Sequence, residues 1–371
     1  MQRVRIQKAA TAGVSLAAVA LVAACSSSGS GGGSSSGSAS ASASGAASSS
    51  APANVSGTLN GSGSTLQQVY QQAAIQSFKS IQPSLTVNYG AGGSGKGRTD
   101  LASGVVNYAG SDSPIPAKEE ANFKGKKVLY FPDVIAPVTV SYNLPGVSKL
   151  QLSAPVIASI FQAKIKSWNN SAIAADNPGV KLPSTPITIA HRSDSSGTTQ
   201  NFSQFLVDAS GDGWTLGTDS TINWPATSRA GDGNAGVAQI IKSTPGAIGY
   251  VDYADAKASK LVFASIKNKV GKYVAPSVSA ASAAASQATL KPDLTFSAIW
   301  APGAGSYPIT AQSWVLVYQA QSKSSTTAGL KAYIGYLVGD GQKLLSTLGF
   351  APLPANIDAK AKAQLSQIGS S

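Results

Sequence analysis

Residues 186–207 read PITIAHRSDSSGTTQNFSQFLV, which combines a strand-like segment, a polar loop and a helix-like segment. We interpret 186–190 as a short strand and 199–207 as a helix. The inward face of that helix would hold Phe202, Phe205 and Leu206. Segments of both kinds alternate along the rest of the chain, and this alternation is typical of α/β architecture.

The loop inside this stretch carries groups that bind anions. Arg192 offers a planar guanidinium that is always charged. Ser196, Gly197 and Thr198 offer two hydroxyls and the N–H groups of a helix start, which carry partial positive charge. The plainer alternative is an exposed arginine paired with nearby Asp194.

Other predicted elements extend the pattern on both sides. They are a helix over 66–81 that stops at Pro83, strands over 85–89, 128–131, 136–142 and 313–318, and helices over 328–337 and 342–348. The Ala/Ser-rich stretch 277–288 lacks large apolar side chains, and we predict a solvated helix there.

Composition limits the classes of function. The 371 residues are 43% hydrophobic and 12% charged, which favours two domains with sizeable cores. The single Cys excludes an intramolecular disulfide, and one Cys with one His leaves no Cys/His zinc cluster. The net charge of +12 is scattered without a basic run, which argues against nucleic-acid binding but favours a small anionic ligand.

The N-terminus has the pattern of a signal peptide over residues 1–24. Arg3, Arg5 and Lys8 precede an apolar stretch, 9–24, that would rise about 24 Å as a helix and so fall short of a bilayer core. It ends in Leu-Val-Ala-Ala-Cys, which resembles the lipobox of bacterial lipoproteins and predicts lipidation of Cys25. The alternative is an ordinary signal peptide with an incidental cysteine.

A tether is predicted over residues 25–56. Residues 26–50 are Ser, Gly and Ala without a charged or aromatic group, so they cannot bury enough apolar surface to become ordered. A flexible chain of about 30 residues reaches roughly 30 Å, which would hold a globular part away from a membrane.

Three more loops contain small polar groups suited to an anion. They are residues 61–66 (GSGSTL), 90–97 (GAGGSGKG) and 109–114 (AGSDSP). Glycines let an anion approach backbone N–H groups, and Ser94 adds a hydroxyl. Alone, the first loop could be a helix N-cap formed by Ser64 or Thr65, and the third a simple turn. Asp112 in the third loop makes sense beside an anion only if that anion has a proton to donate.

Enzyme motifs are incomplete. Residues 90–97 nearly match the P-loop pattern, but Gly97 replaces the hydroxyl residue that would hold Mg²⁺. The G-x-S-x-G motif of serine hydrolases surrounds none of the loop serines. His191 has no identifiable partner, and we interpret it as structural. We therefore predict no catalytic residue, no metal site and no cofactor.

The order and spacing of the four loops resemble the phosphate-binding lipoprotein of the bacterial high-affinity phosphate ABC transporter. The resemblance runs from Gly57 to the C-terminus and is most specific at Ser111-Asp112 and at residues 192–198. It implies ligand contacts from Thr65, the backbone N–H of Leu66, Ser94, Asp112, Arg192, Ser196, Gly197 and Thr198. It also implies that Asp194 orients Arg192. The chain departs from the family at Leu66 (usually Phe), at Ser195 (often Gly) and at Lys96, which we expect to be solvated.

The same resemblance implies a two-lobed periplasmic-binding-protein-like fold of type 2, each lobe a central mixed sheet flanked by helices. Lobe 1 would comprise 57–134 and 309–371, lobe 2 would comprise 135–308, and a two-strand hinge would join them. The implied function is to bind inorganic phosphate in the interlobe cleft, outside the cell membrane. A monomer would deliver it to the permease and ATPase subunits of an importer.

Asp112 would discriminate between anions by their protons. Phosphate keeps a proton at neutral pH and can donate it to a carboxylate, whereas sulfate has none. Arsenate is isosteric with phosphate and is a second candidate ligand. Two hypotheses from different functional classes are a secreted phosphatase and a purely structural module of the cell surface.

Overall fold

The computed structural model describes residues 54–369, which belong to one compact unit, Ala51–Ser371. The predicted signal peptide, Cys25 and the tether up to residue 53 lie outside the described residues. None of the helices in this part of the chain has the length and apolarity that crossing a membrane requires.

Strands of the described region form a large sheet and a small one. The large sheet has nine strands in the order β2-β1-β3-β12-β4-β8-β6-β7 with β9 beside β4, and β11-β10-β5 form the small sheet. The strands are β1 (Gly57–Gly63), β2 (Leu85–Ala91), β3 (Tyr108–Ser111), β4 (Val128–Tyr142), β5 (Gln151–Leu152), β6 (Thr188–Arg192), β7 (Arg229–Gly231), β8 (Ala247–Asp252), β9 (Val262–Phe263), β10 (Ser265–Lys267), β11 (Tyr273–Val274) and β12 (Thr310–Tyr318).

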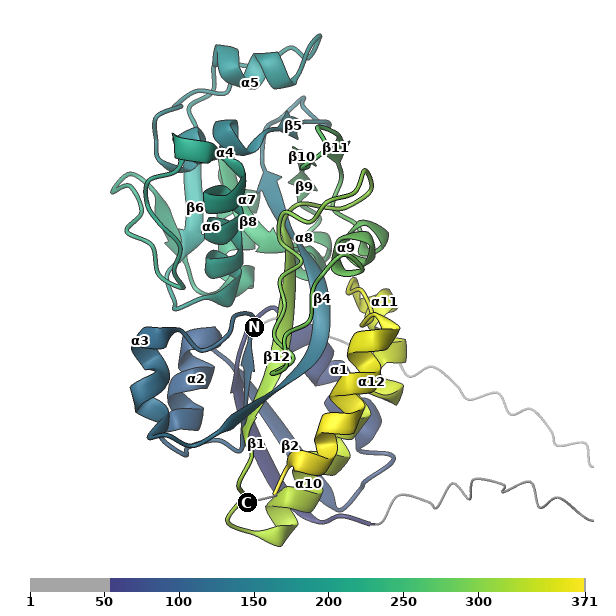
Figure 1. Ribbon diagram of the computed structural model, residues 1–371. Coiled ribbons are helices and arrows are strands. Elements are labelled where there is room, and N and C mark those ends of the chain that lie inside the picture. Colours follow the sequence, from purple (N-terminus) through teal and green to yellow (C-terminus); the bar gives the residue numbers. More distant parts are fainter. Residues whose placement is uncertain (1–53, 370–371) are drawn as a thin grey trace, which may run out of the picture. The chain divides into compact units, whose positions relative to one another are not determined.

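Helices cover both halves of the large sheet (Figure 1). The α-helices are α1 (Gln68–Phe78), α2 (Ser94–Ala102), α3 (Ala117–Glu120), α4 (Ala154–Phe161), α5 (Ser171–Asp176), α6 (Gly197–Ala209), α7 (Gly233–Ser243), α8 (Tyr253–Ala258), α9 (Val278–Ala285), α10 (Ser324–Leu337), α11 (Leu345–Leu348) and α12 (Ala355–Gln364). Short 3₁₀ helices are η1 (Ala121–Phe123), η2 (Gly211–Gly213), η3 (Asp340–Leu344) and η4 (Leu365–Gln367). The α/β architecture predicted from the alternation of segments is confirmed.

The long strand β4 joins the two halves of the sheet. Its first part pairs antiparallel with β12, and its last part, Val138 to Tyr142, pairs antiparallel with β8. On one side lie the parallel strands β2, β1 and β3, and on the other the parallel strands β8, β6 and β7. The predicted lobe boundary at 134/135 falls within β4, and the lobe limits stay a prediction.

Two strands predicted over 128–131 and 136–142 are one strand in the structure. Pro132 lies between the two predicted segments, and proline cannot donate a ladder hydrogen bond. The register between β4 and β12 shifts at this point: Pro132 lies opposite Trp314, Val134 lies opposite Ser313, and Asp133 is the extra residue. A bulge of this kind lets the strand continue past the proline.

The glycine-rich stretch 90–97 is only partly a loop. Helix α2 begins at Ser94, so Gly95, Lys96 and Gly97 are helical. A Cβ atom at Gly97 would lie 2.7 Å from both the Gly63 Cα and the Ser62 carbonyl oxygen. Gly97 therefore allows α2 to pack closely on β1, a role that the sequence pattern did not distinguish from that of a loop glycine.

Two predicted helices also differ in the structure. Within the stretch 277–288, Val278–Ala285 form α9, but four of its alanines are buried rather than solvated: Ala280, Ala281, Ala284 and Ala285. Small side chains let this helix pack against the region of β4 and β12. The helix predicted over 342–348 is η3 followed by α11.

Arg98 on α2 is a buried cation that fixes the chain around β3. Its Nε and Nη2 donate to the two carboxylate oxygens of Glu119 at 2.6 and 3.0 Å. Its Nη1 donates to Ser111 Oγ at 3.0 Å and to Ser113 Oγ at 3.2 Å. Arg98 therefore connects α2 and α3 to the residues on both sides of Asp112.

Replacing Arg98 should destabilise the fold. Arg98→Met leaves the Glu119 carboxylate, whose side chain is 20% exposed, without its cation. Removing one partner of a buried ion pair leaves the other charge unpaired. We therefore expect the free energy of unfolding to fall by about 2–4 kcal/mol in urea titrations. Lys343→Met, which breaks an exposed pair with Asp340, is the control and should leave the urea midpoint unchanged. Equal midpoints for wild type and Arg98→Met would contradict this assignment.

Candidate anion-binding site

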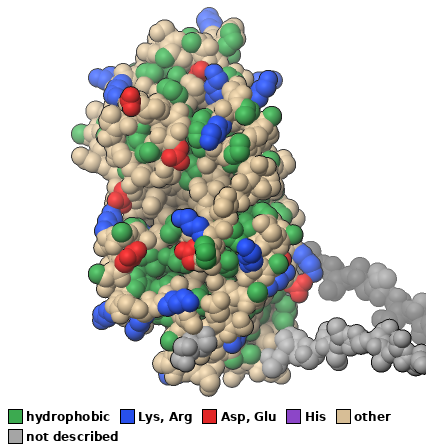
Figure 2. Space-filling view, viewed as in Figure 1, with side chains coloured by type: hydrophobic (Ala, Val, Ile, Leu, Met, Phe, Trp, Pro, Cys, Tyr) green, Lys and Arg blue, Asp and Glu red, His purple; other side chains and the backbone are tan. Residues whose placement is uncertain are grey.

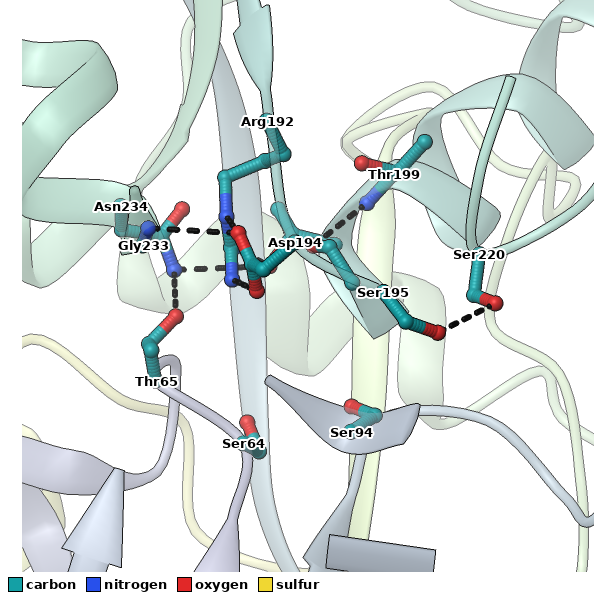
Figure 3. A network of polar contacts seen from close by, with 12 residues as sticks. Ser64, Thr65, Ser94, Arg192, Asp194, Ser195, Thr199, Ser220, Gly233 and Asn234 are labelled. Atoms are coloured by element: carbon teal, nitrogen blue, oxygen red, sulfur yellow. Dashed lines mark hydrogen bonds and ion pairs between the residues drawn. The ribbon is translucent and has the colours of Figure 1, made fainter. Parts of the chain in front are cut away.

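The four predicted loops meet in one buried place. The loops after β1, β2 and β3 lie at the carboxyl ends of parallel strands, where ligands bind in open α/β sheets. The loop after β6 faces them from the other half of the sheet (Figure 3). The predicted site residues that lie together here, all buried, are Thr65, Leu66, Ser94, Asp112, Arg192, Ser196, Gly197 and Thr198.

Asp112 is held by serine hydroxyls from three different segments. Its Oδ1 accepts hydrogen bonds from Ser64 Oγ at 2.5 Å and from Ser313 Oγ at 2.6 Å. Its Oδ2 accepts a longer one from Ser94 Oγ at 3.3 Å. A Cβ atom at Gly197 would lie 2.9 Å from Oδ2, so this oxygen faces the helix α6. Oδ2 is therefore the carboxylate oxygen with acceptor capacity toward the site.

Burial raises the pKa of the Asp112 carboxyl above its ordinary value. Hydrogen bonds from Ser313, Ser64 and Ser94 and the positive charge of Arg192 oppose this shift, because they stabilise the ionised form. The site thus combines a dry carboxyl group with donors that favour its anion.

The guanidinium of Arg192 is fixed by Asp194. Arg192 Nε donates to Asp194 Oδ1 at 2.6 Å, and Nη2 donates to Asp194 Oδ2. The remaining Nη1 donates to Thr198 Oγ1 at 3.3 Å. Asp194 Oδ1 also accepts the backbone N–H of Gly233 at 3.2 Å. Held on one edge by a bidentate pair, the guanidinium keeps a defined orientation.

Helix α6 points its N-terminus into the same place. Ser196 is the N-cap, and its Oγ accepts the backbone N–H of Thr199 at 3.1 Å. Since the hydroxyl oxygen accepts, its hydrogen remains available to another acceptor. The first-turn N–H groups of Gly197 and Thr198 add the positive end of the helix dipole.

Direct hydrogen bonds join the two sets of loops. Gly95 N donates to the Ser195 carbonyl oxygen at 3.0 Å, and Asn201 Nδ2 donates to the Asp112 carbonyl oxygen at 2.7 Å. Gly93 has φ 90°, and a Cβ atom there would lie 2.3 Å from Asp194 Oδ2. Only glycine therefore fits at this approach of the two halves.

Four residues of the network were absent from the predicted set: Ser64, Ser313, Asn201 and Asn234. Ser64 stands in the first quoted loop, where it was considered only as an N-cap. Ser313 and Asn201 lie inside a predicted strand and a predicted helix, where pattern alone gives no reason to select them. Asn234 follows β7, a strand of three residues that carries little sequence signal.

Other singled-out residues lie outside the network. The Lys96 ammonium pairs with Asp100, and the lysine side chain is 54% exposed. The His191 ring stacks on Trp224 with 5.2 Å between centroids, and its Nδ1 contacts the Arg192 carbonyl oxygen at 2.8 Å. Leu66 lies in the first site loop, but its side chain packs into the core. Within 54–369, no cluster of three or more His, Cys, Asp or Glu side chains could hold a metal ion.

Surface charge is diffuse on the face shown in Figure 2, where Lys and Arg side chains are scattered over both halves and interspersed with acidic ones. Among the ion pairs, Lys118 of α3 contacts Asp219, which follows α6 in the chain. The candidate site residues of the four loops are themselves buried.

Comparisons with known proteins agree with this arrangement. A family model described as a PBP superfamily domain matches residues 48–341. The phosphate-binding protein PstS of Pasteurella multocida (strain Pm70) is 34% identical over 314 residues, which cover 83% of this chain and 89% of that protein. PstS 3 of Mycobacterium leprae (strain TN), also a phosphate-binding protein, is 34% identical over 313 residues, 82% of this chain and 85% of that protein.

The fold also matches solved structures. A high affinity periplasmic phosphate-binding protein (PfluDING), solved with phosphate bound, superposes with a TM-score of 0.69 at 22% identity, covering 83% of this chain and 94% of that one. Such a likeness concerns the fold, and it confirms the predicted two-lobed type 2 class.

Asp133, the bulge residue of β4, is a second buried carboxyl near the site. Its Oδ1 accepts the backbone N–H of Val134 at 2.9 Å, and its Oδ2 has no partner among the described residues. Burial raises the pKa of the Asp133 carboxyl well above its ordinary value of 3.8, and the negative charge of Asp112 raises it further.

This raised pKa predicts how stability depends on pH. In the interval above pH 3.8 and below the raised pKa, the folded protein keeps the Asp133 proton that the unfolded chain has lost. Stability therefore falls as the pH rises through that interval. Asp133→Asn should remove this contribution, raising the melting temperature near pH 8 by about 2–4 °C and reducing its fall between about pH 5 and pH 8.

The matched control is Asp208→Asn, at an exposed position of α6. Its melting temperatures should follow those of wild type at both pH values. Parallel curves for wild type and Asp133→Asn would show that Asp133 does not titrate in this way.

Proposed function

This chain belongs to the PBP superfamily and to the PstS family of phosphate-binding proteins, and we propose that it binds inorganic phosphate between lobe 1 and lobe 2. The observation that carries the proposal is the position of Asp112 Oδ2. This carboxylate oxygen faces the N-terminus of α6, the positive charge of Arg192 acts on the same carboxyl, and the nearby Asp194 carboxylate is engaged by Arg192. An anion accepted there must itself carry a proton, and phosphate does.

The remaining donors would surround the anion from both lobes. Thr65 and the backbone N–H of Leu66 would contribute from lobe 1, and Ser94 would join them by turning its hydroxyl hydrogen from Asp112 Oδ2 to the anion. The contributions of lobe 2 would come from Arg192, Ser196, Gly197 and Thr198. Bridging gives the closed state contacts that the open state lacks, which is what ligand-driven closure requires.

Discrimination against sulfate would follow from the same oxygen. Phosphate would donate its proton to Asp112 Oδ2, whereas sulfate would leave a buried carboxylate facing an anion. Sites built around such a hydrogen bond reject the analogue that lacks it by roughly 10⁴–10⁵. Arsenate carries the same proton and has the same shape, so it is a second candidate ligand.

The geometry around Ser196 is less consistent with a phosphatase than with a phosphate-binding protein. The Ser196 oxygen accepts a backbone N–H as an N-cap, and the single histidine stacks on Trp224 instead of contacting a serine. Neither group is arranged as a nucleophile with its base.

The proposed cellular role is uptake. After cleavage of the signal peptide 1–24, Cys25 would carry a lipid, and the tether would hold the binding protein on the extracytoplasmic face of the membrane. A monomer would pass phosphate to the permease of an ABC importer driven by its ATPase subunits.

Calorimetric titration tests the ligand. The full chain, freed of co-purified phosphate, should bind phosphate one-to-one and give no heat with sulfate. Asp112→Asn should bring the affinities for phosphate and sulfate closer together, because the amide no longer depends on the ligand's proton. Arg192→Lys should weaken both anions, since its charge attracts either one.

The outcomes separate the parts of this proposal. If neither phosphate nor sulfate binds, the assignment of the fold stands, but phosphate is refuted as the ligand. Sulfate binding as tight as phosphate, or an unchanged ratio in Asp112→Asn, would refute the role of Asp112.

Fractionation of producing cells tests the anchor. Wild type should incorporate labelled palmitate and sediment with membranes, whereas Cys25→Ser should do neither, because the thiol that would carry the lipid is gone. Ser27→Ala, a neighbouring substitution that keeps the cysteine, is the control and should behave as wild type. Membrane association that survives Cys25→Ser would contradict lipidation at this residue.

A further inference from the structure

Asn234 lies between two of the threonines assigned to the phosphate site. It is the second residue of α7, and its side chain is fully buried. Its Nδ2 donates to Thr65 Oγ1 at 3.0 Å and reaches Thr198 Oγ1 at 3.4 Å. Figure 3 shows this side chain pointing at Thr65, which comes from the opposite half of the sheet.

The orientation of the amide is fixed by its other end. Asn234 Oδ1 accepts the backbone N–H of Asp252 at 3.3 Å. A backbone N–H can only donate, so the amide oxygen must face Asp252. The NH₂ group must therefore face the two threonines, and it can only donate to them.

This donor determines where the threonine hydrogens point. A hydroxyl has one hydrogen and two lone pairs. Thr65 Oγ1 uses a lone pair to accept from Asn234, so its hydrogen is directed elsewhere. Thr198 Oγ1 accepts from both Asn234 and Arg192 Nη1, which occupies both lone pairs. Both hydroxyls are thus left as donors, which is the form an oxyanion needs.

We propose that Asn234 is a positioning residue that orients the Thr65 and Thr198 hydroxyls as donors to the bound anion. This inference rests on the proposed function. Asn234 does not itself touch the anion; it presets two donors, one from each lobe, before the ligand arrives. Preset donors bind more tightly because no hydroxyl has to reorient on binding.

Thr65 should depend on Asn234 more than Thr198 does. Within the described residues, the side-chain hydrogen bond of Thr65 comes from Asn234, whereas Thr198 also accepts from Arg192. Gly233, the preceding residue, donates its N–H to Asp194, which orients Arg192. Loss of the Asn234 amide should therefore act mainly through Thr65.

A double-mutant cycle on phosphate affinity tests this role. We expect Asn234→Ala and Thr65→Val in the full chain each to raise the phosphate Kd about tenfold, which is the worth of one buried hydrogen bond. If Asn234 acts through Thr65, the double variant should bind within about threefold of Thr65→Val alone. Asn177→Ala removes an equally buried amide elsewhere and should leave Kd unchanged.

A second variant, Asn234→Asp, keeps the volume of the side chain, so it should fold as the wild type does and change only the chemistry at this position. The carboxylate of Asn234→Asp would accept from Thr65 and turn its hydrogen away from the anion, so Kd should rise more than in Asn234→Ala. Melting temperatures identify any unfolded variant.

The results separate this inference from the proposed function. Wild-type affinity in Asn234→Asp, or independent and multiplying effects of Asn234→Ala and Thr65→Val, would overturn the role of Asn234 alone. A wild-type chain that binds no phosphate would overturn the proposed function and this inference together.

Discussion

Burial of the Asp112 carboxyl is the constraint on which the site depends. A buried carboxylate costs free energy unless hydrogen bonds replace its hydration. Here the replacements are the hydroxyls of Ser64, Ser94 and Ser313, which come from the end of β1, the start of α2 and the strand β12. These three segments have to converge on one point for the carboxyl to be tolerated. The bulge in β4 lies directly opposite Ser313, and the buried Arg98 holds both neighbours of Asp112.

Positive groups from the opposite half of the sheet face the Asp112 carboxyl. The Arg192 guanidinium, oriented by Asp194, and the N-terminus of α6 give a cluster of donors across from the single carboxyl. Glycines at 93 and 197 let the two sets approach closely, because a Cβ at either position would collide with the facing loop. In the proposed function, an acceptor on one side and donors on the other would select an anion that carries a proton, and so would favour phosphate over sulfate.

Much of the fold and of the candidate site could be predicted, because the patterns that indicate them involve residues close together in the sequence. Helix and strand periodicity identified β6, α6 and β12, and the inward Phe202, Phe205 and Leu206 are buried as predicted. The polar loops were recognisable since glycines and hydroxyls at helix starts are chemically distinctive over short stretches. The prediction of two separate strands over 128–131 and 136–142 was wrong, because the bulge that carries β4 past Pro132 depends on the register of its partner β12. The solvated face predicted for 277–288 was wrong because small alanines pack well once a neighbouring surface exists.

The sequence by itself determined the α/β class and the four polar loops whose chemistry suits an anion, since each depends on residue types within a few positions of one another. Only the tertiary structure decided which further groups complete the site. Ser313 is 201 residues from Asp112 in the chain, Asn201 is 89 from Asp112, and Asn234 is 169 from Thr65. Hydrogen bonds reach only about 3 Å, so such partners are specified by the folding of the whole sheet and leave no local pattern in the sequence.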